Sequence, residues 1–284
     1  MLSRPSTLAV GASVRSAAMP DQRLSVRTRV AIGVVRTATT ALKATGQRER
    51  ALRWRIDRAR AKRLAAGPDD PLVHPALYDM DRKLDAILDR DGGFFVEAGG
   101  NDGYTQSNTY WLERYRGWRG LLVEPMQELY ELCRAERPAS TVVRAALVPS
   151  DHEGDTVQMR FADLMSTVVG EHEDPWRTRM GNALGWRDAY DAAVPARPLS
   201  SILDEIGAPE IDLLSLDVEG FEPSVLAGLD LERHAPRWIL VEVHDEATGR
   251  PPIEAVLGDR YALHERLSPL DLLYRRADVA APSA

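Results

Sequence analysis

The sequence of 284 residues contains a single cysteine, Cys133. One thiol cannot form an intramolecular disulfide or a zinc site of several cysteines, so a reducing compartment is the simplest setting. Long apolar runs are also missing: the stretch at residues 30–35 falls far short of the ~20 residues that span a bilayer, and no secretory signal follows the expected pattern. We therefore expect a cytoplasmic protein, with the inner face of a membrane as the alternative location.

Lysine is scarce as well, with three among 36 basic residues, and charge is divided unevenly along the chain. Residues 1–66 carry 15 Lys or Arg and 3 acids, whereas the remainder carries 21 Lys or Arg and 40 acids. A basic leader can bind anionic lipids or fold back onto its own acidic domain. Residues 47–66 predict a basic helix, which is either a solvated helix resting on the domain or a peripheral membrane contact. The acidic remainder argues against nucleic acid as a partner.

The turn residues Gly67-Pro68-Asp69-Asp70-Pro71 mark the end of the basic region. We expect a partly disordered or helical extension over residues 1–67, with Met19 as a second candidate start, one large domain over 68–279, and a flexible tail at 280–284. Strands are predicted at 94–98, 120–124, 140–146, 211–217 and 237–243, and more weakly at 156–161, 260–265 and 270–275. Helices are predicted at 72–88, 105–115, 126–136, 199–206, 221–228 and 252–257.

This alternation of strands and helices predicts a Rossmann-like α/β fold, in which a mainly parallel sheet is covered by helices on both faces. Residues 162–195 interrupt the alternation and are rich in large side chains. They are either a lid or substrate wall, with Met165 and Trp176 as candidate substrate contacts, or a helical excursion that those side chains pack.

The first predicted strand ends in Glu97 and runs into a turn with Gly99, Gly100 and Gly103. Ligands of parallel sheets bind at the carboxyl ends of the strands. A dinucleotide motif would need a glycine where Asn101 stands. The Glu97 carboxylate would repel a pyrophosphate and would suit an ammonium group, such as that of S-adenosylmethionine. The turn therefore favours a methyl donor over NAD.

The next two strands add groups for the rest of this cofactor. Glu124 ends the second strand, 27 residues after Glu97, where an acid commonly accepts hydrogen bonds from ribose hydroxyls. Ala146, at the end of the third strand, is small enough to leave room for an adenine ring, although small strand residues are also ordinary core residues.

Acids and a histidine follow the fourth and fifth strands. Methyl transfer to oxygen needs a base, and imidazoles ordinarily titrate near neutrality, so we predict His244 as the base and Asp217 as its orienting group or as the base itself. Two alternatives stay open: Mg²⁺ held by Asp217, His244 and Asp245, which we favour less than a metal-free site, and a structural role for His244.

With these motifs placed, residues 94–246 resemble the FkbM-type family of S-adenosylmethionine-dependent methyltransferases. The resemblance rests on the sequences Phe95-Val96-Glu97-Ala98-Gly99-Gly100-Asn101-Asp102-Gly103, Gln106-Ser107-Asn108-Thr109, Gly120-Leu121-Leu122-Val123-Glu124-Pro125, Leu216-Asp217-Val218-Glu219-Gly220-Phe221-Glu222 and Val241-Glu242-Val243-His244. It implies a class I methyltransferase fold with a seven-stranded sheet, and O-methylation of a sugar, glycolipid or secondary metabolite.

By position, the resemblance assigns cofactor binding to one set of residues and the acceptor to another. The cofactor set is Glu97, Gly99, Asn101, Gly103, Ser107, Asn108 and Glu124, to which Ala146 and Asp217 are added as neighbours. The acceptor set is Asp217, Glu219 and His244. A catalytically silent S-adenosylmethionine-binding or interaction protein is the second hypothesis, and an NAD-linked oxidoreductase is the third.

Overall fold

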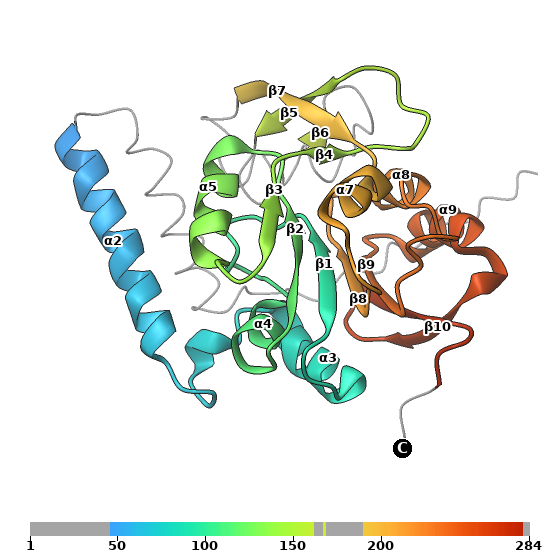
Figure 1. The fold of residues 1–284 in the computed structure, drawn as a ribbon, viewed down its shortest axis with the longest axis horizontal. Coiled ribbons are helices and arrows are strands. Elements are labelled where there is room, and N and C mark those ends of the chain that lie inside the picture. The colour runs from blue at the N-terminus through green and yellow to red at the C-terminus, as the bar shows by residue number, and fades with distance from the viewer. Residues whose placement is uncertain (1–45, 162–166, 169–189, 281–284) are drawn as a thin grey trace, which may run out of the picture.

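A seven-stranded sheet forms the centre of the computed structural model, which describes residues 46–161, 167–168 and 190–280 (Figure 1). The order of its strands is β10-β11-β9-β8-β1-β2-β3. Neighbours from β3 to β9 are parallel, whereas β11 is antiparallel to both β9 and β10. The strands are β1 (Phe94–Ala98), β2 (Arg119–Val123), β3 (Thr141–Val143), β8 (Leu213–Leu216), β9 (Trp238–Glu242), β10 (Tyr261–Arg266) and β11 (Asp271–Arg276). The prediction of a mainly parallel, Rossmann-like sheet is confirmed.

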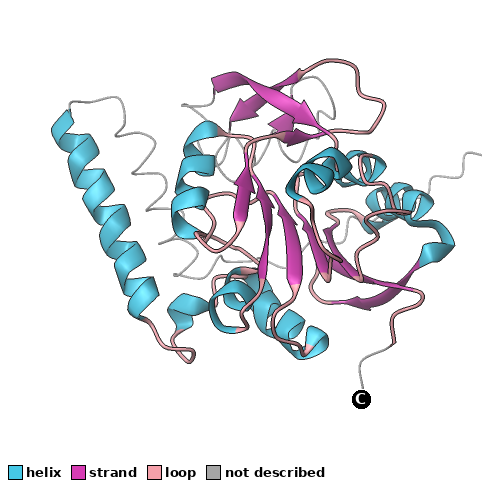
Figure 2. Cartoon of the chain, in the orientation of Figure 1, coloured by secondary structure: helices cyan, strands magenta, loops and turns pink. Residues whose placement is uncertain are grey.

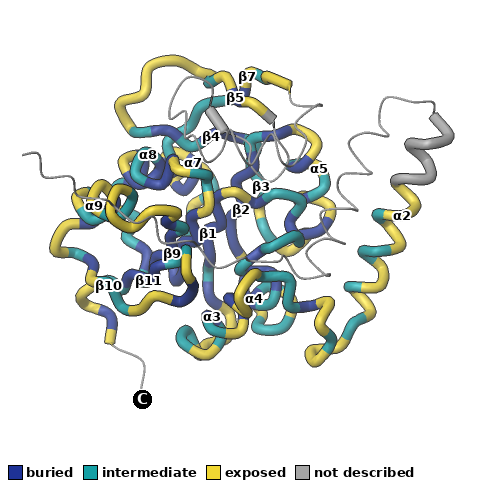
Figure 3. The backbone as a smooth tube through the Cα atoms, turned by 180° about the vertical axis from the view of Figure 1, so that it is seen from behind, coloured by how far each residue is buried: buried dark blue, intermediate teal, exposed yellow. Residues whose placement is uncertain are grey.

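Helices cover both faces of this sheet, because successive strand residues point to opposite sides (Figure 2). Phe95 packs in one buried cluster with α3 (Met80–Leu88), α4 (Tyr110–Tyr115) and α5 (Gln127–Glu136). Val96 and Ala98 pack in another with α7 (Leu199–Ile206), α8 (Glu222–Ala227) and α9 (Glu246–Leu257). The inner strands β1, β2, β8 and β9 are consequently almost entirely buried (Figure 3), and each apolar side chain buried there contributes about 1.5–3 kcal/mol to folding.

A smaller sheet, in the order β4-β7-β5-β6, lies beside β3. Its strands are β4 (Ala146–Leu147), β5 (Thr156–Phe161), β6 (Thr167–Val168) and β7 (Tyr190–Arg197). The third strand predicted at 140–146 is therefore wrong in extent: β3 ends at Val143, the Arg144 side chain donates to the Pro125 carbonyl (3.2 Å), and Ala146 begins β4, which pairs with β7. Most of the predicted lid, including Met165 and Trp176, lies outside the described residues, as do residues 1–45 and 281–284.

The predicted helices differ from the observed ones mainly at their first residues. The helix expected at 72–88 begins only at Met80, because two 3₁₀ turns (Pro71–Val73 and Leu77–Asp79) precede it and Tyr78 has a positive φ of 55°. The helix expected at 105–115 begins at Tyr110. The helix expected at 252–257 begins earlier, at Glu246, because Asp245 caps its first turn.

The basic helix predicted at 47–66 is observed as α2 (Gly46–Ala65). Near its last turn, Arg63 donates to both carboxylate oxygens of Glu136 (3.0 and 2.7 Å), whose side chain is 3% exposed. The Arg63 guanidinium lies 4.1 Å from the centre of the Tyr104 ring, and the Tyr115 hydroxyl donates to the Ala66 carbonyl (2.6 Å). These contacts anchor one end of α2 to the α/β body, along whose flank the helix extends (Figure 1).

No helix among the described residues combines the length and apolar character needed to cross a bilayer.

We predict that Arg63→Met releases this anchor. Glu136 would lose its bidentate partner while remaining buried, so we expect the free energy of unfolding to fall by roughly 1–3 kcal/mol, less than for a fully buried pair because Arg60 stays 3.5 Å away. Amide hydrogen exchange in residues 53–65 should accelerate. Arg58→Met, on the exposed side of the same helix, is the matched control, and equal exchange in both variants would contradict the anchor.

Candidate active site

The glycine loop, residues 99–109, connects β1 to α4 and starts at the carboxyl edge of the sheet. The backbone N–H groups of Gly99 and Gly100 both donate to the Val123 carbonyl (3.1 and 3.0 Å), which bends the chain over the end of β2. Gly99 has a φ of +87°, and a Cβ at this position would overlap the Asp217 carbonyl oxygen. Gly103 has a φ of +80° and lies against Cys133 of α5. Both positions therefore require glycine.

Glu97 holds this loop from beneath. Its carboxylate is buried and accepts hydrogen bonds from the Ser107 hydroxyl (3.0 Å), the Thr109 hydroxyl (2.6 Å) and the Asn108 N–H (2.9 Å). The Asn108 amide donates in turn to the Ser215 hydroxyl of β8 (3.1 Å). The structure thus brings the predicted residues Glu97, Ser107 and Asn108 together, but it directs the Glu97 carboxylate toward its own loop. Its direct contact with a ligand ammonium stays a prediction.

Arg137, which sequence reasoning missed, completes this network. Its side chain is 1% exposed, and its guanidinium donates to the Ser107 hydroxyl (3.0 Å), the Thr109 hydroxyl (2.8 Å), Glu97 (3.4 Å) and Glu113 (2.9 Å). One buried cation therefore offsets two carboxylates and ties the loop to the end of α5. No sequence motif indicates this role, because Arg137 lies 40 residues from Glu97 along the chain and directly after the last residue of α5.

Glu124 reaches the same loop from the end of β2. Its carboxylate accepts hydrogen bonds from the Asn101 N–H (2.9 Å) and the Met126 N–H (2.8 Å), and Asn101 has the left-handed φ of +46° that asparagine tolerates. Burial is the main cause that raises the pKa of Glu124 to about 8. Each carboxylate oxygen can accept a second hydrogen bond, so the position remains compatible with the predicted ribose contact.

Ala146 is placed differently from the sequence expectation. It is 5% exposed and packs with Met126, Leu129, Met159 and Val194 under the smaller sheet. The strand that was to carry it past the cofactor ends three residues earlier. Its contact with an adenine ring stays a prediction that this packing does not support.

An acidic cluster with a histidine occupies the ends of β8 and β9. Asp217 and Glu242 share a hydrogen bond; burial first, and the neighbouring negative charges second, raise the pKa of Asp217 to about 7 and that of Glu242 to about 11. Asp217 is accessible to solvent although the surrounding protein desolvates its carboxylate. His244 is exposed, and its Nε2 lies 3.5 Å from Glu242 and 3.6 Å from Glu219.

Glu242 is the second residue that was missed, although its position could have been found. Residues 238, 240 and 242 alternate along β9 and share one face of the sheet, and His244, two residues beyond the strand, lies 3.5 Å from Glu242. Trp238 and Leu240 of this series pack in the same cluster as Phe95 of β1. The face that carries Glu97 therefore also carries Glu242.

A divalent cation could be held by Glu219, Glu242 and His244, whose ligand atoms all lie within 4.8 Å of one another. This set shares only His244 with the one expected from the sequence, Asp217, His244 and Asp245, which stays a prediction. The Asp245 carboxylate caps α9, accepting hydrogen bonds from the Ala247 N–H (3.0 Å) and the Thr248 hydroxyl (3.0 Å).

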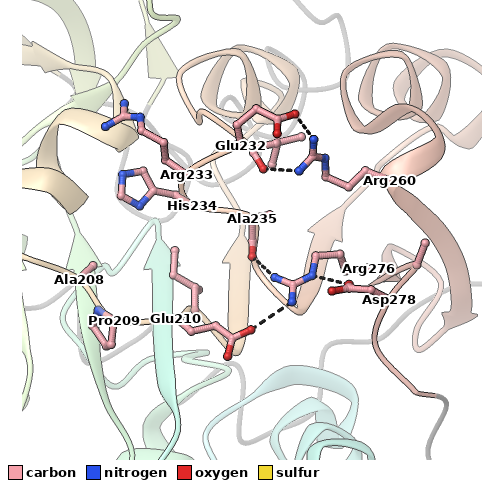
Figure 4. A pocket seen from close by; sticks show the side chains of 13 residues that line it. Ala208, Pro209, Glu210, Glu232, Arg233, His234, Ala235, Arg260, Arg276 and Asp278 are labelled. Carbon is pink, nitrogen blue, oxygen red and sulfur yellow. Dashed lines mark hydrogen bonds and ion pairs between the residues drawn. The ribbon is translucent and has the colours of Figure 1, made fainter.

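A separate hollow of about 610 Å³ lies at the opposite, amino-terminal ends of β8 and β9 (Figure 4). Its arginines are neutralised locally: Arg276 contacts Glu210 and Asp278, and Arg260 contacts Glu232. Since ligands of parallel sheets bind at the carboxyl ends of the strands, we assign the active site to the glycine loop and the acidic cluster.

Comparisons with known proteins identify the family of the chain. A family model described as "Methyltransferase FkbM domain" matches residues 97–265. The methyltransferase sdnD of Sordaria araneosa is 30% identical over a match of 189 residues. This match covers 59% of this chain and 72% of that protein.

Two solved structures show a distant likeness. A TehB-like SAM-dependent methyltransferase from Corynebacterium glutamicum is 14% identical, with a TM-score of 0.39 over 80% of this chain and 96% of that one. An O-methyltransferase from Bacillus cereus in complex with SAH is 12% identical, with a TM-score of 0.36 over 85% and 95%. At these scores, the fold assignment depends on the strand order of the chain itself.

We predict that Gly99→Ala disrupts both the loop and the end of β8, because the new methyl group would overlap the Asp217 carbonyl oxygen. We expect a loss of roughly 2–4 kcal/mol in the free energy of unfolding, measured by urea denaturation. Gly117→Ala is the control, since Gly117 also has a positive φ (+66°) but no atom within 4 Å of the added carbon. Equal losses in the two variants would show that the close approach is unimportant.

A second prediction concerns the buried acid Glu124. Its folded-state pKa of about 8 exceeds the value of about 4.3 expected in the unfolded chain, so the folded protein holds this proton more tightly. The stability from Glu124 should be complete below about pH 4 and be lost as the pH rises to 8, by an amount on the order of 5 kcal/mol. Urea denaturation across this range should show a steeper loss in the wild type than in Glu124→Gln. The exposed Glu128→Gln is the control, and parallel curves for all three proteins would refute the assignment.

Proposed function

Because the chain belongs to the FkbM methyltransferase family, we propose that it transfers a methyl group from S-adenosylmethionine to a hydroxyl of a sugar, glycolipid or secondary metabolite. One observation carries this proposal. An exposed histidine, His244, lies within reach of two carboxylates at the same sheet edge as the glycine loop.

The cofactor would occupy the edge formed by the glycine loop and Glu124. Glu124 would accept the ribose hydroxyls, for which its oxygens keep lone pairs available. Asp217 is better placed than Glu97 for the ammonium group: the residue is exposed, and its backbone lies against Gly99. Glu97, Ser107 and Asn108 would then act indirectly, by fixing the shape of the loop.

The acceptor would approach His244 from the solvent side. When bound, S-adenosylmethionine supplies an electrophilic methyl carbon on a sulfonium sulfur. The His244 imidazole would remove the hydroxyl proton as the oxygen forms its bond to that carbon and the carbon–sulfur bond breaks, giving a methyl ether. The Glu219 carboxylate, 3.6 Å from Nε2, would stabilise the resulting imidazolium, and such a base contributes about 10²–10⁴-fold to the rate.

A magnesium ion on Glu219, Glu242 and His244 is the competing mechanism. It would occupy the imidazole as a ligand and so remove it as a base, and the bound cation would acidify the acceptor hydroxyl instead. We favour the metal-free base, because Asp217 and Glu242 share a hydrogen bond with each other. The proton in this hydrogen bond already reduces the negative charge of the cluster, so no cation is needed to offset it.

The predicted result for His244→Asn is a turnover reduced by about 10²–10⁴-fold with nearly unchanged affinity for S-adenosylmethionine. Glu124→Ala should show the opposite division, with weakened cofactor binding. Titration calorimetry with S-adenosylmethionine measures binding, and transfer of labelled methyl groups to a panel of hydroxylated sugars, glycolipids and polyketides measures turnover.

Several outcomes would count against the proposal. Cofactor binding without transfer to any acceptor in the panel would favour the silent binding protein, and binding of NAD in place of S-adenosylmethionine would favour an oxidoreductase. Turnover lost with EDTA and restored by Mg²⁺ would replace the base with the metal mechanism. Equal turnover in the wild type and His244→Asn would remove His244 from the reaction.

A further inference from the structure

Helix α2 has an inner face fixed to the body and an outer face that is exposed in the described part of the chain. Ile56, Ala59, Arg60 and Arg63, spaced three or four residues apart, are partly buried. Arg63 and Arg60 both approach the buried Glu136 carboxylate, at 2.7 and 3.5 Å. The orientation of α2 about its own axis is therefore set by the anchor.

The outer face is basic and contains an aromatic residue. The side chains of Arg53, Arg55, Arg58 and Lys62 are exposed, and Trp54 is 59% exposed. The Arg58 guanidinium lies 5.2 Å from the centre of the Trp54 ring. Single exposed apolar side chains are common, so the feature of this face is the combination of a tryptophan with four cations.

The charge of the helix contrasts with that of the body. The sequence of α2 contains eight Lys or Arg and two acids, whereas residues 67–284 carry 40 acids and 21 bases. The inner face satisfies a buried acid of the body through Arg63. The outer arginines are exposed on a helix that lies at the flank of the α/β body (Figure 1), so they can meet an external anion.

We propose that the outer face of α2 binds the surface of a membrane that contains anionic phospholipids. Arginine forks match phosphate oxygens, basic segments are attracted to anionic leaflets, and tryptophan favours the boundary between headgroups and acyl chains. A flat surface can touch one helix at the flank and leave the acidic body in water. An extended nucleic acid would be repelled by that body.

The contact rests on side chains outside the active site and is independent of the acceptor's identity. Full-length protein should co-sediment with vesicles of phosphatidylcholine mixed with phosphatidylglycerol and not with phosphatidylcholine alone, and added salt should weaken the binding. Arg55→Glu combined with Arg58→Glu should reduce the fraction bound by about tenfold or more. Trp54→Ala should reduce it by a smaller factor.

The matched control is Arg82→Glu combined with Arg134→Glu, which changes the net charge equally at exposed positions of α3 and α5. This control should bind like the wild type, and circular dichroism should show equal helix content in all variants. Equal losses in both double variants, full binding by the α2 variant, or binding to phosphatidylcholine alone would overturn the proposal. Tighter binding to duplex DNA than to the mixed vesicles would also overturn it.

Discussion

The buried contact between Arg137 and Glu97 is the interaction on which the proposed cofactor site depends. A carboxylate with 5% exposure is costly unless donors surround it, and Arg137, Ser107, Thr109 and the Asn108 N–H supply them. Since three of these donors come from the glycine loop, the hydrogen bonds that stabilise the buried Glu97 carboxylate also fix the conformation of the loop. The loop therefore has its shape without a bound ligand.

The acids at the ends of β8 and β9 are stabilised in a different way. Asp217 and Glu242 share a hydrogen bond, and both have raised pKa values, while His244 lies beside Glu219 and Glu242. A neutral carboxyl in this group lowers the repulsion between the acids. The same sheet edge therefore offers a rigid, neutralised half beside a half that can exchange protons.

The sequence could predict the features that depend on neighbouring residues, and it could not predict those that depend on contacts between distant parts of the chain. Strand β1, the helix at 199–206 and the acids at 97, 124 and 217 were predictable because apolar period and strand-end chemistry are local. The break between Val143 and Ala146 was not, since it depends on pairing with β7, some 50 residues away. Arg137 and the anchor Arg63 were hidden for the same reason: each is one of many arginines, and only tertiary contact distinguishes it. The capping role of Asp245 was also hidden, because it depends on where α9 begins.

The adjacent residues Glu136 and Arg137, at the end of α5, make contacts with two different parts of the chain. Glu136 faces the leader helix through Arg63, and Arg137 faces the glycine loop through Ser107 and Glu97. The leader is thus joined electrostatically to the wall of the proposed cofactor site, although it lies outside the segment that matches the family. A shortened protein that begins at the α/β body would keep every residue of the proposed active site, yet it would leave a desolvated anion next to the residue that braces the loop.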